Sequence, residues 1–104
     1  MMIPEESKKL FLTKYSTFGN DKFYKFLLNY AINRIVSGKD LKVPSPEVEL
    51  MDYHDKFLLL YRRESDEAYL DIAKLFRKAA HKIYRIMLKK DLVEKNNKFL
   101  NLAD

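Results

Sequence analysis

The chemistry-bearing side chains that lie closest together in the sequence are two carboxylates and an imidazole, Asp52, His54 and Asp55. Such groups bind metal ions or transfer protons when they converge on one point. On a helix, Asp52 and Asp55 share a face, whereas His54 points roughly 100–200° away from them. The only other histidine is His81. The spacing therefore predicts no metal site at this cluster.

Other catalytic groups are scarce in this sequence. There is no cysteine, which excludes thiolate metal sites, disulfides and cysteine catalysis. The serines have no nucleophile-elbow motif around them, and Gly19 and Gly38 stand too far apart to form a phosphate-binding loop. We therefore expect no enzymatic activity and no cofactor.

Basic side chains gather late in the chain. The net charge is +5, and no acidic residue occurs between residues 74 and 90. Successive cations in this run are mostly three or four residues apart, so a helix would present them along one face. Such a stripe can neutralise phosphates without reading a base sequence. The candidate polyanion-binding residues are Lys74, Arg77, Lys78, Lys82, Arg85, Lys89 and Lys90.

A second interpretation of the stripe is internal charge balance. Residues 43–71 hold eight acidic and three basic side chains. If the chain turns back near Ser65, Asp55 would lie near Lys74, and Glu47 and Glu49 would lie near Lys82. The stripe would then be a partly self-paired, solvated face, and exposed pairs of this kind contribute only about 0–1 kcal/mol each.

The elements that must position these residues are predicted to be helices only. Neither Gly nor Pro occurs after Pro46, and apolar residues recur at helical spacing. We expect helices over residues 21–36, 46–63 and 66–90, capped by Asn20, Ser45 and Ser65 respectively. Residues 1–19 form an arm or a short helix, and residues 95–104 a tail that frays or adds a turn. The prediction is one all-α domain over residues 1–104, a small bundle of three to four helices.

The junction between the second and third helices has two solutions. Residues 62–66 contain no Gly or Pro, so they form either a tight corner or the middle of one long helix. A continuous helix over residues 46–90 would be roughly 67 Å long at 1.5 Å per residue. A chain of this size cannot cover such a rod alone, so the rod would require an oligomer. The antiparallel hairpin is the preferred alternative.

These features favour two functions. The first is a non-enzymatic protein–protein interaction or scaffold module that self-associates through Leu28, Ile32, Leu75 and Ile86. The second is a nucleic-acid-binding accessory protein that uses the basic stripe on the third helix. No apolar run approaches the ~20 residues of a membrane span, so no membrane role is expected. The absence of cysteine is consistent with the cytoplasm.

Overall fold

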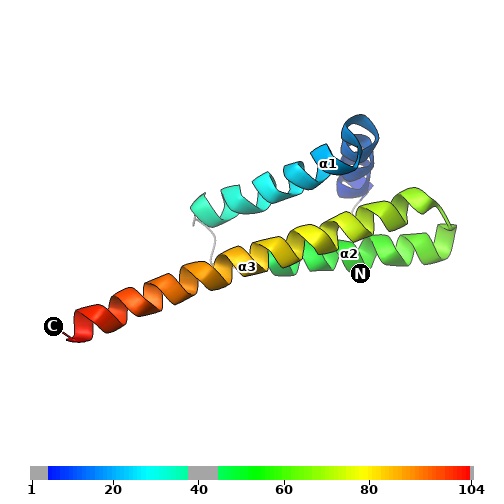
Figure 1. The fold of residues 1–104 in the computed structure, drawn as a ribbon. Coiled ribbons are helices and arrows are strands. Elements are labelled where there is room, and N and C mark those ends of the chain that lie inside the picture. The colour runs from blue at the N-terminus through cyan, green and yellow to red at the C-terminus, as the bar shows by residue number, and fades with distance from the viewer. Residues whose placement is uncertain (1–4, 38–44, 104) are drawn as a thin grey trace.

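A computed structural model describes the backbone of residues 5–37 and 45–103, and the side chains of residues 5–35 and 45–89. Three helices account for this part of the chain: α1 (Glu5–Ser37), α2 (Pro46–Glu64) and α3 (Glu67–Ala103). The described residues contain no strand. Helices α2 and α3 form an antiparallel hairpin, and α1 lies across one side of it (Figure 1). The predicted all-α bundle is confirmed.

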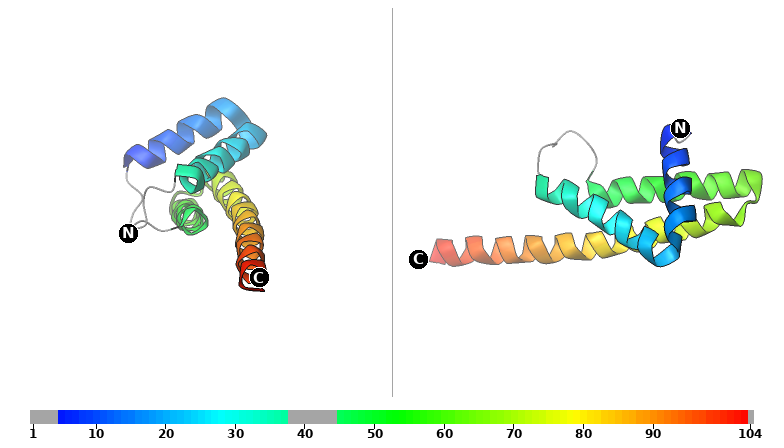
Figure 2. Two further views of the ribbon diagram at one scale, coloured as in Figure 1. Left: turned by 90° about the vertical axis from the view of Figure 1, so that its left-hand side faces the viewer. Right: turned by 90° about the horizontal axis from the view of Figure 1, so that it is seen from above.

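Helix α1 consists of two helical segments that meet at a kink. Gly19 has φ 75° and ψ −176°, a combination that is open essentially to glycine alone. The kink separates the predicted helix over residues 21–36 from the arm before it, which is helical from Glu5 onward. The two segments point in clearly different directions, so that the first crosses the hairpin and the second runs obliquely along it (Figure 2).

The corner between α2 and α3 is made by two adjacent residues. Ser65 adopts a left-handed conformation (φ 56°), and its N–H donates to the carbonyl of Tyr61 at 2.8 Å. Asp66 Oδ1 then accepts a hydrogen bond from the N–H of Ala68 at 3.0 Å. Ser65 therefore ends α2 and Asp66 caps α3, which corrects the predicted cap by one residue. The alternative of one rod over residues 46–90 is wrong.

Helix α3 is longer than predicted. It continues from Glu67 to Ala103 rather than ending near residue 90, and residues 95–103 are its last turns. Its C-terminal part runs on past the start of α2 (Figure 1). No helix in the described ranges has the combination of length and apolar character needed to cross a bilayer.

The core is built on phenylalanine. Phe76 of α3 is fully buried, and its ring lies 5.0 Å from that of Phe11, 6.0 Å from Phe23 and 5.7 Å from Phe57, measured between centroids. The ring of Tyr53 stacks on it at 5.4 Å. Because these partners come from both segments of α1 and from α2, Phe76 joins every helix of the bundle.

Candidate functional site

Five cations line a shallow hollow between α1 and α3, which we call the basic hollow. Its volume is about 380 Å³. One lining residue comes from α1 and the others from three successive turns of α3: Tyr24, Lys74, Arg77, Lys78, His81, Lys82 and Arg85. The structure thus brings five of the seven predicted polyanion-binding residues together around one depression.

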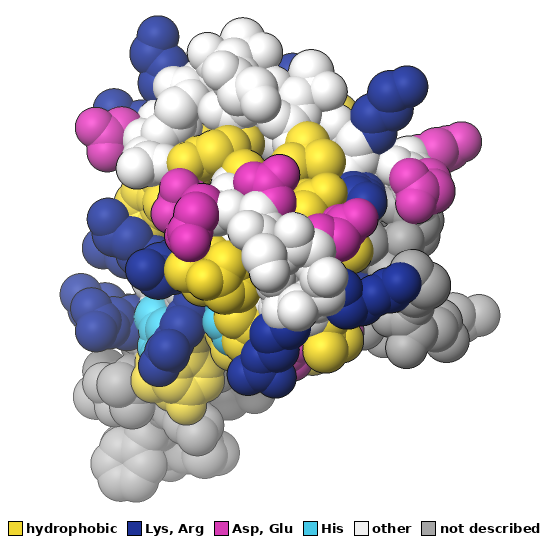
Figure 3. Space-filling model, turned by 90° about the vertical axis from the view of Figure 1, so that its right-hand side faces the viewer, with side chains coloured by type: hydrophobic (Ala, Val, Ile, Leu, Met, Phe, Trp, Pro, Cys, Tyr) yellow, Lys and Arg dark blue, Asp and Glu magenta, His cyan; other side chains and the backbone are white. Residues whose placement is uncertain are grey.

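All five cations of the basic hollow are exposed, and none forms an ion pair with a carboxylate whose position is described. The predicted pairs with Asp55, Glu47 and Glu49 are absent from the described residues. Asp55 instead contacts His54, its neighbour in the chain, at 2.9 Å. Figure 3 shows several acidic side chains near the middle of one face, with Lys and Arg interspersed among hydrophobic side chains below them.

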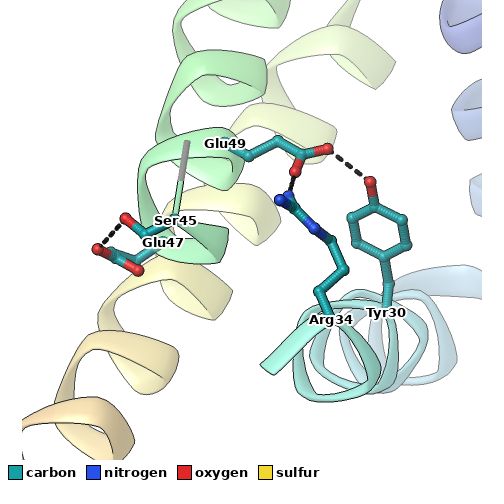
Figure 4. A network of polar contacts seen from close by, with 5 residues as sticks. All are labelled: Tyr30, Arg34, Ser45, Glu47 and Glu49. Atoms are coloured by element: carbon teal, nitrogen blue, oxygen red, sulfur yellow. Dashed lines mark hydrogen bonds and ion pairs between the residues drawn. The ribbon is translucent and has the colours of Figure 1, made fainter. Parts of the chain in front are cut away.

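Glu49 is directed away from the stripe by α1. Its carboxylate forms an ion pair with Arg34 and accepts a hydrogen bond from the Tyr30 hydroxyl at 2.5 Å (Figure 4). Partial burial, the main cause, and the nearby Tyr53 raise the pKa of Tyr30, so its hydroxyl keeps the proton that it donates. The charge of Glu49 is therefore neutralised by α1 rather than by α3.

Tyr24 supports one cation of the hollow. The ammonium group of Lys78 lies 4.5 Å from the centroid of the Tyr24 ring. A cation over an aromatic face gains about 0.5–1 kcal/mol at an exposed site. The contact holds Lys78 at the junction between α1 and α3 without cancelling its charge, so that the charge stays available to an anion.

The basic stripe extends beyond the hollow along α3. Lys89 lines a further depression of about 410 Å³ together with Lys82, Arg85, Ile86 and Leu88. The side chain of Lys90 lies outside the described residues. From Lys74 to Lys89 the stripe is about 22 Å long at 1.5 Å per residue.

A second pocket adjoins the basic hollow, and we call it the apolar pocket. It lies between the start of α2 and the middle of α3 and has a volume of about 360 Å³. Its walls are Glu47, Val48, Met51, Ala80, His81 and Tyr84. Val48 and Tyr84 are unusually open for apolar side chains, with 52% and 53% of their surface exposed. The sequence analysis did not predict this pocket. Its walls come from two helices, and the sequence alone does not show which residues of one helix lie opposite which residues of the other.

The four predicted interface residues differ in their exposure to solvent. Leu28 and Ile32 of α1 and Leu75 of α3 are partly buried and pack against the core. Ile86 is the exposed member of the set, at 37%. Most of this predicted surface is therefore already used inside the bundle.

The side chains of Asp52, His54 and Asp55 do not converge on one point, because each carboxylate has a different partner. Lys56 pairs with Asp52 at 2.8 Å, while His54 contacts Asp55. No three His, Asp or Glu side chains in the described ranges come close enough together to hold an ion. His81 lines both the basic hollow and the apolar pocket, which makes it the link between the two.

In comparisons with known proteins, no family model, no curated protein and no solved structure matches the chain.

Proposed function

We propose that this protein is a nucleic-acid-binding accessory protein and that phosphates bind in the basic hollow. The observation that carries the proposal is the set of five exposed cations around one hollow, Lys74, Arg77, Lys78, Lys82 and Arg85, with no described carboxylate paired to them. Like-charged side chains held this close repel one another, and a polyanion relieves that repulsion.

The dimensions of the stripe suit a phosphate backbone. A length of about 22 Å equals the axial rise of roughly six base pairs of a duplex, at about 3.4 Å each. Exposed Lys and Arg side chains bind phosphates mainly by displacing condensed counterions. The expected interaction is therefore electrostatic, weak in sequence preference at the hollow itself, and strongly dependent on salt.

Fluorescence anisotropy of labelled single-stranded and duplex oligonucleotides tests the proposal. We expect micromolar or tighter binding at about 50 mM salt that weakens steeply toward about 200 mM. If all five cations contact phosphates, the slope of log K against log salt is about −3.5 for a single strand. Failure to bind either form at low salt, or binding that is insensitive to salt, would contradict the proposal.

A second candidate function is self-association, and two exposed apolar side chains in the middle of α3 favour it. Tyr84 and Leu88 lie one turn apart on the same face of α3, and both are open to solvent, Leu88 with 43% of its surface exposed. A second copy of the chain would cover these side chains. Sedimentation equilibrium without nucleic acid should then give a mass above the monomer that returns to 12.4 kDa in the Leu88→Glu variant. A monomer at all concentrations would exclude this function.

A further inference from the structure

We infer that the apolar pocket takes an unstacked nucleobase from a single strand whose phosphates lie on the basic hollow, and that Glu47 selects bases carrying an amino group. This inference rests on the proposed function and specifies its substrate. The two cavities share His81 as a common wall, so a strand can place its backbone in one and a neighbouring base in the other.

The lining of the apolar pocket excludes a phosphate and suits a base. Val48, Met51 and Ala80 supply apolar walls, and the one acidic side chain, Glu47, repels anions. Bases combine apolar faces with polar edges, which are the two properties this lining can satisfy. The exposed ring of Tyr84 at the pocket wall offers a face for stacking.

The carboxylate of Glu47 has one oxygen satisfied and one unsatisfied. Its Oε1 accepts a hydrogen bond from Ser45 Oγ (Figure 4), whereas Oε2 is buried and has no hydrogen-bond partner among the described residues. A buried carboxylate oxygen without a donor is destabilising. Glu47 lines the apolar pocket, and the last torsion of a glutamate side chain is broad, so rotation of the carboxylate can present an oxygen to a donor in the pocket.

The unsatisfied oxygen of Glu47 requires a hydrogen-bond donor, and the four bases differ in the donors that they offer. Cytosine and adenine carry exocyclic amino groups, and carboxylates accept hydrogen bonds from them. Guanine likewise carries donors on its pairing edge. Thymine and uracil present one N–H between two carbonyl oxygens, which a carboxylate repels. Glu47 should therefore favour amino-bearing bases over thymine or uracil of similar size.

The pocket also predicts the strandedness of the nucleic acid. A base in a duplex is stacked and paired, so it enters a protein pocket only after it has been extruded at a cost of a few kcal/mol. A single strand avoids most of this cost. We therefore expect single-stranded oligonucleotides to bind more tightly than duplexes of the same length and salt conditions.

Anisotropy titrations with oligo(dC) and oligo(dT) of about 12 nucleotides test this inference at mildly alkaline pH, where cytosine remains neutral. Wild-type protein should prefer oligo(dC) by about tenfold, the worth of one hydrogen bond to a charged group. In Glu47→Gln the preference should vanish or reverse, because the amide also donates to a thymine carbonyl. The matched control is Glu67→Gln, an exposed acidic residue in the first turn of α3, which should keep the tenfold preference.

Tyr84→Ala provides a variant that leaves Glu47 intact. It should weaken the binding of both oligonucleotides by about tenfold through lost stacking, while the preference for oligo(dC) remains. Equal binding of the two oligonucleotides by the wild type, or a preference that persists in Glu47→Gln, would overturn the base pocket and leave the basic hollow in place. Absence of binding to either oligonucleotide at low salt would overturn both proposals together.

Discussion

Replacing Lys78, Lys82 and Arg85 by glutamate is expected to lower the affinity for single-stranded DNA by roughly 100-fold at near-physiological salt. All three side chains line the basic hollow and are exposed. If each phosphate contact contributes about 0.5 kcal/mol and each glutamate adds repulsion of the same size, the loss is about 3 kcal/mol. The slope of log K against log salt should also become shallower by about 2, because three phosphate contacts disappear.

A matched triple variant separates local from overall charge. Lys9, Lys22 and Lys25 are exposed residues of α1 that do not line the hollow, and their replacement by glutamate changes the net charge by the same amount. This control should retain most of the affinity. Circular dichroism of both variants should show unchanged helicity, since Lys, Arg and Glu have similar helix propensities. Equal losses in the two variants would mean that binding depends on net charge and not on the hollow.

The helices were predictable because their signals are local. Apolar spacing, the absence of Gly and Pro after Pro46, and the Ser45-Pro46 start all act within a few residues. The corner at Ser65 was harder to predict, because the apolar pattern stays in phase across it and no glycine marks the left-handed residue. There the hydrogen bond that Asp66 Oδ1 accepts from the N–H of Ala68, together with the shared core, offsets the cost of a serine at positive φ.

The basic stripe was also predictable from the sequence, whereas the side chains that lie beside it in the structure were not. Residues three or four apart on a helix share a face wherever that helix packs. The alignment of Lys74, Lys78 and Lys82 therefore follows from their spacing alone. Which carboxylates approach them depends on tertiary structure. The sequence suggested Glu49 as a partner of the stripe. In the structure, its carboxylate instead binds Arg34 and Tyr30, which both belong to α1. The apolar pocket depends on the same long-range placement.

Phe76→Ala should have the largest effect on stability, lowering the free energy of unfolding by about 3–5 kcal/mol. The Phe76 ring is fully buried and contacts aromatic rings from both segments of α1 and from α2, so its removal leaves a cavity that no single helix can close. A domain of this size is stable by only about 5–15 kcal/mol, so the loss is a large share of the total. Urea denaturation followed by circular dichroism measures it.

The packing of Phe76 also affects the basic hollow. Phe76 directly precedes Arg77 and Lys78 in α3, and its packing fixes the side of α3 that faces α1 and Tyr24. The control is Phe18→Ala, whose ring is 36% exposed and whose loss should cost clearly less, because water already reaches it. If Phe76→Ala and Phe18→Ala destabilised the protein equally, Phe76 would not be the centre of the core. A destabilised but folded Phe76→Ala protein should also bind single-stranded DNA more weakly, because the cations of the hollow are held in place by the helix that Phe76 anchors.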